Sequence, residues 1–252
     1  MSTCSGPCRR LVLAAGLAVM AATACAYRDG ADDPLSRKLN WFSYLNGDDI
    51  RAQCGPGMPA RYRLVYNGVY FAPGNEQVRT YDVWAAGPAA EHRVVVRVIG
   101  PLRLDAVVID DPIGTLFRDP RDLLAPGRGT IRQITVDDDD LTALDRSLAE
   151  SGFFAPAPRG LRLRSEDFFW LGAVCVDGRF VFNAFRWPSA AFDGLTFPAL
   201  LLAWDPTGIP INPPKRLTAF DVYGSATPDP GAMQSFSLTV GDNGLVGVHT
   251  LF

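Results

Sequence analysis

The segment Phe168–Trp187 constrains the fold more than any other part of this chain. Two apolar runs flank the dipeptide Asp177-Gly178, which is typical of the two-residue turn of a β-hairpin. Such a turn fixes the register and places Cys175 opposite Phe180. The pairs that follow are Ala173–Phe182, Leu171–Ala184, Val174–Val181 and Trp170–Phe185. Because both faces are largely apolar, we expect this hairpin at the centre of a sheet that is covered on both sides.

Further strands are expected on either side of the hairpin. Gly and Pro make up 24 + 20 = 44 residues and are scattered between apolar runs, as turns between short strands would be. The expected strands are Tyr62–Tyr66, Gln77–Ala85, Arg93–Ile99, Leu102–Ile109, Thr130–Val136, Arg216–Tyr223, Met233–Val240 and Leu245–Leu251. Asn67-Gly68 and Gly241–Gly244 are predicted turns. The expected fold class is mainly β (α+β): antiparallel sheets with a central two-residue hairpin and two to four short helices.

One helix has a clear pattern. It opens at Asp137–Asp140, presents Leu141, Leu144 and Leu148 on one face, and stops at Gly152. Three shorter helices are expected: Leu35–Leu45 with a stop at Asn46-Gly47, Asp49–Cys54 capped by Asp48, and one that begins near Phe197 or Pro198. The aromatic residues Trp41, Phe42 and Tyr44 in the first of these are equally compatible with a strand.

The N-terminus has the pattern of an export signal. Arg9 and Arg10 precede an apolar run that ends in small residues at Cys25. The run of about 14 residues is shorter than the roughly 20 that span a bilayer. The sequence Ala22-Thr23-Ala24-Cys25 resembles the lipobox of bacterial lipoproteins, and the resemblance implies cleavage before Cys25 and lipids on its thiol and new amine. The expected organisation is a signal peptide (1–24), a lipidated tether (25–33) and one β-rich envelope domain (34–252).

Two alternatives for this segment remain. Ala22-Thr23-Ala24 also fits the cleavage site of an ordinary secretory signal, which would leave a soluble periplasmic or secreted protein. The arginine pair could belong to a twin-arginine signal, although its flanking residues do not support that reading. Ala26, rather than an aspartate, follows Cys25, so resemblance to enterobacterial sorting implies the outer membrane, with the domain facing the periplasm.

Charge excludes some partners. Removing Arg9 and Arg10 leaves 22 basic and 27 acidic side chains, a net charge of 22 − 27 = −5. This mildly acidic balance is unlike that of nucleic-acid-binding proteins. No polybasic segment is present, so membrane attachment is expected to come from lipid on Cys25.

Two cysteines remain beyond the signal and the tether. Cys54 and Cys175 form an even pair in an oxidising compartment. They are either joined in a disulfide or buried as two separate thiols; sequence leaves both possibilities open.

Patterns for catalysis and cofactors are weak. His92 and His249 have no partner at the spacing of a metal site or a catalytic triad, so we expect surface or structural roles, no metal and no cofactor. Asp137–Asp140 is better explained as a helix cap than as a calcium loop. The adjacent carboxylate pairs are Asp48/Asp49, Asp110/Asp111 and Glu166/Asp167; each pair should diverge, because neighbouring side chains point in different directions. Trp41, Trp84 and Trp204 could line a ligand groove or pack in the core.

The sequence therefore favours an exported, lipid-anchored envelope protein with a non-catalytic role in binding, scaffolding or assembly, whose partner is an unidentified envelope protein or ligand. The alternative is a periplasmic hydrolase whose carboxylates are brought together by the fold.

Overall fold

The computed structural model describes residues 41–69, 77–87, 90–100, 129–218 and 236–250. They form two antiparallel sheets and five short helices, which confirms the predicted mainly β fold class. The strands are β1 (Arg61–Gly68), β2 (Val78–Trp84), β3 (His92–Ile99), β4 (Thr130–Val136), β5 (Arg162–Arg164), β6 (Phe168–Val176), β7 (Arg179–Arg186), β8 (Phe236–Val240) and β9 (Leu245–Thr250). The helices are residues 41–46, α3 (Asp48–Gln53), α6 (Asp138–Glu150), α7 (Ala190–Asp193) and α8 (Phe197–Ala203).

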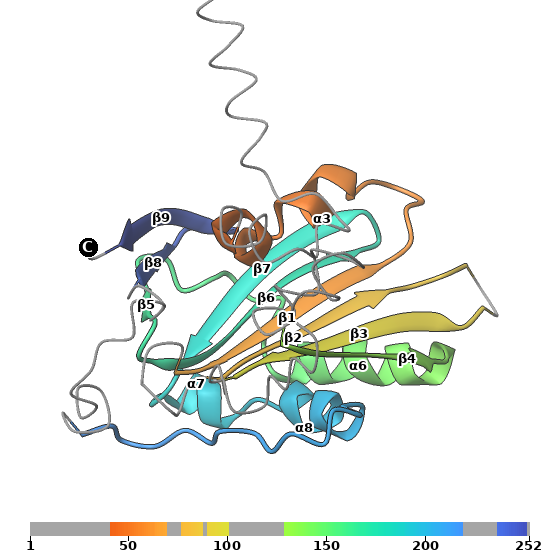
Figure 1. Ribbon diagram of the computed structural model, residues 1–252. Coiled ribbons are helices and arrows are strands. Elements are labelled where there is room, and N and C mark those ends of the chain that lie inside the picture. The colour runs from red at the N-terminus through yellow and green to blue at the C-terminus, as the bar shows by residue number, and fades with distance from the viewer. Residues whose placement is uncertain (1–40, 70–76, 88–89, 101–128, 219–235, 251–252) are drawn as a thin grey trace, which may run out of the picture.

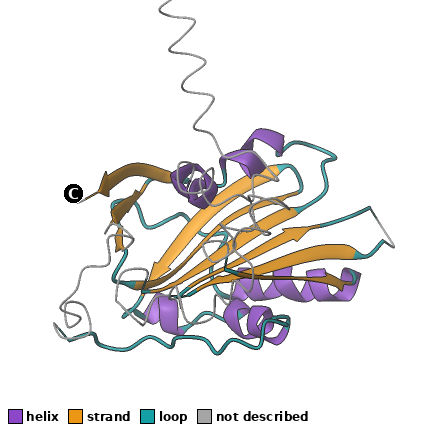
Figure 2. Cartoon of the chain, in the orientation of Figure 1, coloured by secondary structure: helices purple, strands orange, loops and turns teal. Residues whose placement is uncertain are grey.

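The larger sheet lies between two layers. Its strand order is β4-β3-β2-β1-β6-β7, and the smaller sheet has the order β5-β8-β9. Figure 1 shows α6, α7 and α8 against one face of the large sheet, with α3 and the small sheet on the other side. Figure 2 shows the same arrangement by type of secondary structure. We call these the α6 face and the α3 face.

The two faces carry separate cores. On the α6 face, Leu144 of α6 and Leu201 of α8 pack against Leu64 and Tyr81 of the sheet, and all four are buried. On the α3 face, the core of buried residues comprises Tyr44, Leu45, Ile50, Val65, Val78, Leu163, Phe169, Leu171, Ala173, Cys175, Phe182, Ala184, Leu238, Val240 and Leu245. The two central strands, β1 and β6, are therefore buried on both sides, as predicted for β6.

The predicted β6–β7 hairpin is confirmed in register. Cys175 pairs with Phe180, and Trp170 pairs with Phe185 at the other end. Asp177 (φ 53°) and Gly178 (φ 70°) both adopt the left-handed conformation that a two-residue turn of this hand requires.

Burial along β7 differs from the prediction in one respect. Phe182 and Phe185 are buried as expected, but Phe180 and Val181 are partly exposed. β7 is an edge strand, so its start beside the turn is covered less completely. The guanidinium carbon of Arg51 lies over the Phe180 ring, 4.0 Å from the ring centroid, so Arg51 covers part of this ring.

A side chain connects the small sheet to the free edge of β7. Asn243, in the predicted turn between β8 and β9, accepts a hydrogen bond from the Phe182 N–H (2.7 Å) and donates one to the Phe180 carbonyl (3.1 Å). The amide of Asn243 thus pairs with the edge strand as a backbone would.

The predicted helix starts are mostly confirmed. The carboxylate of Asp137 accepts from the Asp140 N–H (2.9 Å), and the carboxylate of Asp140 accepts from the Asp137 N–H (3.3 Å), so the acidic run is a reciprocal helix cap. The helix at 41–46 stops at Gly47, and α8 begins at Phe197. The one-turn helix α7 was not predicted.

Two local predictions were wrong. Asn67-Gly68 is not a turn, because both residues belong to β1, where Asn67 pairs with Val78 on one side and Phe169 on the other. Pairing on both sides outweighs the turn preference of the dipeptide. Asp48 does not cap α3 but is its first residue; its carboxylate accepts from Ser43 Oγ (2.6 Å) and Asn46 Nδ2 (2.7 Å) instead.

Some predicted strands and helices lie wholly or partly outside the described residues. The strand Leu102–Ile109 lies outside them, as do residues 35–40 of the first helix. Residues 216–218 are not in a strand, and the rest of the predicted strand Arg216–Tyr223 lies outside the described residues.

The hairpin should be a main source of stability. We expect Phe182→Ala to lower the free energy of unfolding by about 3–5 kcal/mol, because it opens a cavity under a side chain that is 1% exposed. Asp177→Ala should cost about 1 kcal/mol, since the side chain is exposed and only the left-handed backbone disfavours alanine. Urea midpoints at equal slope compare the two; equal shifts would contradict a core position for Phe182.

Candidate functional site

Sequence analysis singled out three cysteines as candidate site residues. Cys25 lies outside the described residues. Cys54 and Cys175 are joined in a disulfide, with Cα atoms 5.7 Å apart and 121 residues between them in sequence. Of the two possibilities that sequence leaves open, the structure holds the bonded form. The bond ties the residue after α3 to the end of β6.

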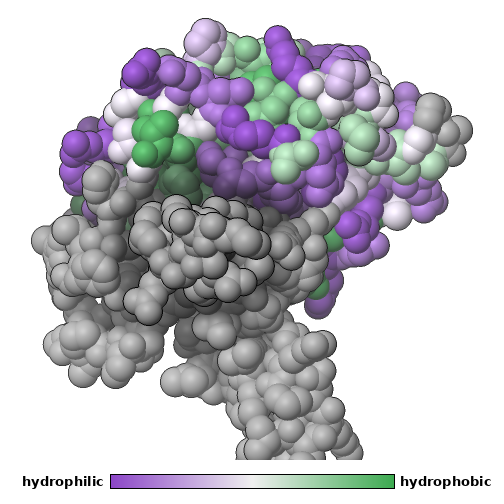
Figure 3. Space-filling model, turned by 90° about the horizontal axis from the view of Figure 1, so that it is seen from above, coloured by the Kyte–Doolittle hydropathy of each residue, from purple (hydrophilic) through white to green (hydrophobic). Residues whose placement is uncertain are grey.

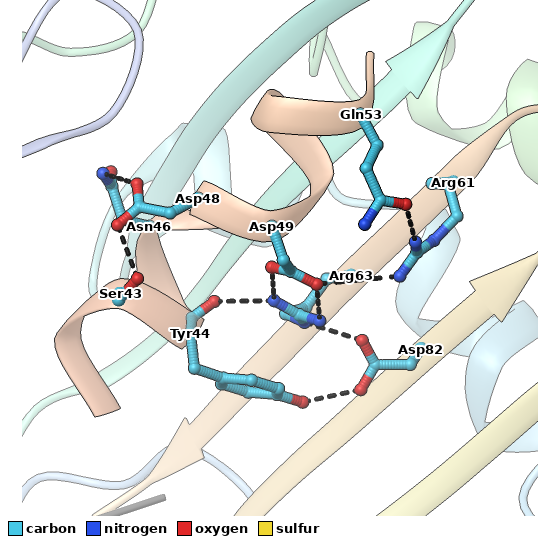
Figure 4. A network of polar contacts seen from close by, with 9 residues as sticks. All are labelled: Ser43, Tyr44, Asn46, Asp48, Asp49, Gln53, Arg61, Arg63 and Asp82. Atoms are coloured by element: carbon cyan, nitrogen blue, oxygen red, sulfur yellow. Dashed lines mark hydrogen bonds and ion pairs between the residues drawn. The ribbon is translucent and has the colours of Figure 1, made fainter. Parts of the chain in front are cut away.

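A buried cluster centred on Arg63, which sequence analysis missed, lies between α3 and the large sheet (Figure 4). The side chain of Arg63 on β1 is 0% exposed. Its Nη1 and Nη2 donate to the two carboxylate oxygens of Asp49 on α3, at 2.7 and 3.0 Å. Its Nε donates to Asp82 on β2 at 2.6 Å, and Nη1 also donates to the Tyr44 carbonyl at 3.0 Å.

Tyr44 closes the cluster from the helix at 41–46. Its hydroxyl donates to the second oxygen of Asp82 at 2.7 Å, and its ring centroid lies 3.9 Å from the guanidinium carbon of Arg63. Burial raises the pKa of the Tyr44 hydroxyl well above its ordinary value, and the charge of Asp82 adds to the rise. Tyr44 therefore stays a neutral hydrogen-bond donor.

The groups around Arg63 offset the effect of burial on its charge. Burial alone lowers the pKa of Arg63, but Asp82, Tyr44 and Asp49 more than offset this and raise it above the ordinary value. Arg61 approaches Asp49 at 3.7 Å and donates to Gln53 at 3.3 Å. Two arginines and two aspartates thus give the centre of the cluster no net charge.

The cluster fixes the helical segment 41–53 on the sheet. Gly47, between the two helices, has φ 68°, and a Cβ there would lie 2.2 Å from the Cβ of Ala173 on β6. Only glycine allows this close approach. Arg63 on the sheet binds a residue of each helix, Tyr44 and Asp49, and the disulfide holds Cys54 at the end of α3. These contacts keep the helical segment in one position on the sheet.

A second buried arginine has a similar role on β2. Arg79 forms an ion pair with Asp205 and donates to the carbonyl of Ile209, while its Nε donates to Gln77 at 3.1 Å. Tyr81 also donates to Asp205, at 3.2 Å. These contacts hold the segment after α8 along the strand.

His92 is used by the fold. Its Nδ1 accepts a hydrogen bond from the Ala86 N–H at 3.0 Å, so its proton lies on Nε2, which donates to Asp138 at 2.8 Å. Both ring nitrogens are therefore engaged, and His92 joins the start of β3 to the start of α6. His249 lies in β9, opposite Ser237.

The adjacent carboxylates diverge as predicted. Asp48 binds within its own helical segment, whereas Asp49 binds Arg63. Glu166 accepts from the Ser165 hydroxyl, and Asp167 accepts from the Arg164 N–H. Asp110 and Asp111 lie outside the described residues.

The fold places Asp145 where two groups distant in sequence act on its carboxylate. Asp145 on α6 accepts a hydrogen bond from the Tyr62 hydroxyl at 2.9 Å. Burial raises the pKa of Asp145, the Tyr62 hydrogen bond opposes the rise, and the nearby charge of Asp177 adds to it. Asp177 comes from the hairpin turn, so only the tertiary fold lets its charge act on Asp145.

The three tryptophans do not form one groove. Trp41 stacks on Tyr44, with ring centroids 5.3 Å apart, and Trp84 is also on the α3 face. Trp204 packs in the core of the α6 face. The sheet therefore separates Trp204 from the other two.

Within the described residues, no group of three or more His, Cys, Asp or Glu side chains is arranged to hold a metal ion. Likewise, none of the helices described has the length and apolar character needed to cross a membrane.

Comparisons with protein-family models, curated proteins and solved structures found no match to this chain.

The Arg63 cluster predicts a strong dependence on Asp49. Asp49→Asn should lower the free energy of unfolding by about 3–5 kcal/mol, because it leaves a buried guanidinium without one of its charge partners. Asp242→Asn is the matched control: Asp242 pairs with Arg159 at 3.2 Å, but both side chains are more than three quarters exposed. It should leave the urea midpoint almost unchanged. A comparable shift in both variants would contradict a structural role of the buried pair.

Asp145 predicts a dependence on pH. Because its pKa is raised in the folded state, its ionisation costs stability as pH rises from about 4. Asp145→Asn removes this cost. The free energy of unfolding of the variant minus that of the wild type should therefore be larger at pH 7 than at pH 3.5. Urea titrations at the two pH values measure the difference. A relative stability that is the same at both values, or lower at pH 7, would contradict the raised pKa.

Proposed function

We propose that this protein is an exported, lipid-anchored envelope protein with a non-catalytic role in binding, scaffolding or assembly. Cys25 carries the lipid, residues 26–33 form the tether, and the β-rich domain stays at the membrane surface. The position of Ala26 favours the outer membrane, with the domain on the periplasmic side.

The observation that carries the proposal is the Cys54–Cys175 disulfide. Structural disulfides form and persist in oxidising compartments such as the bacterial periplasm, and are rare in the cytosol. The bond lies in the folded domain, far in sequence from the export signal. Two independent features of the chain therefore support export.

The non-catalytic role is supported by the use that the fold makes of its reactive groups. Arg63, Arg79 and His92 each bind neighbouring residues of the chain through several atoms. Each joins a strand to another element, which is the task of a structural residue. The exposed surface, rather than these buried clusters, is then the place for a partner.

The anchor is tested by the mass of the mature N-terminus. We expect a chain that begins at lipid-modified Cys25, incorporates labelled palmitate and sediments with membranes. Cys25→Ser should abolish the label and either release the protein into the soluble envelope fraction or leave the signal uncleaved. Cys8→Ser is the matched control, because Cys8 leaves with the signal, and it should behave as the wild type. An unmodified Cys25, or a mature chain that starts at Tyr27, would overturn the proposal.

A thiol assay tests the compartment separately. In the exported chain unfolded in denaturant, which exposes the otherwise buried Cys175, Cys54 and Cys175 should react with a thiol-alkylating reagent only after reduction. The same chain made without residues 1–24 should stay in the cytosol, with both thiols reactive. If the thiols of the exported chain react without reduction, the disulfide no longer supports export.

A further inference from the structure

Asparagine is followed by glycine at three positions within the described residues: Asn46, Asn67 and Asn243. Asparagine is a chemically labile residue, because the backbone nitrogen of the next residue can attack its side-chain amide and expel ammonia. A following glycine favours this reaction, since it has no Cβ to hinder the approach. The three dipeptides are identical in sequence, so their surroundings in the fold decide which of them reacts.

The fold engages the attacking nitrogen at two of the three positions. The Gly47 N–H donates to the Tyr44 carbonyl at 3.1 Å, and the Gly68 N–H donates to the Gln77 carbonyl at 2.8 Å. Within the described residues, the Gly244 N–H makes no hydrogen bond. Because the nitrogen must give up its proton in order to attack, the hydrogen bonds protect the first two positions and leave the third reactive.

The side chain of Asn243 is held in a way that assists the attack. Its Oδ1 accepts from the Phe182 N–H at 2.7 Å, and its Nδ2 donates to the Phe180 carbonyl at 3.1 Å. Attack at Cγ places negative charge on Oδ1, so the Phe182 N–H already points to the atom where charge develops. Asn243 is exposed, and Figure 3, which views the molecule from the side of α3 and β9, shows a largely hydrophilic surface that water can reach.

Arg51 acts on the other reacting group. Its Nη2 donates to the carbonyl oxygen of Asn243, which belongs to the same peptide group as the Gly244 nitrogen. Gly244 is buried, and a Cβ there would lie 2.7 Å from Arg51 Nη2, so the positive charge is very close. A guanidinium in this position draws electron density from the peptide and stabilises the anion that remains when the nitrogen loses its proton.

We propose that Asn243 is a self-modification site, where the chain deamidates its own side chain. The Gly244 nitrogen forms a bond to Cγ of Asn243, and the bond between Cγ and Nδ2 breaks. Nδ2 leaves as ammonia with the proton from the Gly244 N–H, and a cyclic imide remains. Solvent water then opens the imide at either carbonyl, which gives aspartate or isoaspartate.

The product changes a contact between the two sheets. A carboxylate at position 243 has no N–H to donate to the Phe180 carbonyl, so one of the two hydrogen bonds between the β8–β9 turn and β7 is lost. The neutral side chain also becomes negatively charged. The reaction therefore weakens the hold of the small sheet on the edge strand of the large one.

Peptide mapping of the whole chain tests the site, with the other two dipeptides as internal controls. The folded chain is incubated in mildly alkaline buffer and digested with trypsin, which separates the dipeptides into residues 39–51, 64–79 and 217–252. By mass spectrometry, Asn243 should deamidate at least about fivefold faster than Asn46 or Asn67, because freeing the glycine N–H at those positions costs a hydrogen bond. In urea, which removes this protection, the three rates should become similar.

Arg51→Gln tests the activation. It should slow deamidation of Asn243 at least about fivefold, because it removes a hydrogen bond from a charged donor. Arg159→Gln is the matched control: Arg159 pairs with Asp242 in the same turn at 3.2 Å, and both side chains are exposed. It removes the same charge and should change the rate by less than about twofold. Urea midpoints measured before the incubation will show that both variants are folded.

The inference fails if Asn243 stays unmodified in the folded chain, or if Asn46 or Asn67 reacts as fast there. A rate that is unchanged or increased in Arg51→Gln would also overturn it, because Arg51 would then only hold the turn in place. Asn243→Asp reproduces one product and should lower the urea midpoint; an unchanged midpoint would contradict the weakened contact with β7.

Discussion

The buried guanidinium of Arg63 is the contact on which the arrangement of the α3 face depends. It binds Asp49 on a helix, Asp82 on a neighbouring strand and the carbonyl of Tyr44, all within 3.0 Å. An arginine that is fully buried is tolerated only with such partners, because removing its charge from water is costly. The strands and the helical segment 41–53 must therefore assemble together, with each partner in place.

The disulfide and the glycine link make this assembly specific. Cys54 leaves α3 one residue after its end and is bonded to Cys175, which lies beside Arg61 in the register of β1 and β6. Gly47 lets the helices approach β6 at a distance that no other residue would allow.

Local signals predicted the parts of the fold that depend on local interactions. The Asp177-Gly178 turn fixes the β6–β7 register through two residues of left-handed backbone, and the pattern of one strand then determines its neighbour. The reciprocal cap of Asp137 and Asp140 is likewise complete within four residues. Asn67-Gly68 shows the limit: a strong turn dipeptide became part of a central strand, because β2 and β6 pair with it from both sides.

The sequence by itself determined the signal-like N-terminus, the class of fold, the central hairpin and the fact that two cysteines were available to pair. Tertiary structure decided that they do pair, that Arg63 is buried, and that the charge of Asp177 acts on Asp145. Arg61 and Arg63 alternate with apolar residues, a pattern that indicates a solvent-facing side. A helical layer covers that side in the structure. The strands that pair with β1 and the helices that cover it come from other segments of the chain. No local pattern in β1 could therefore reveal its register or the helical layer that buries Arg63.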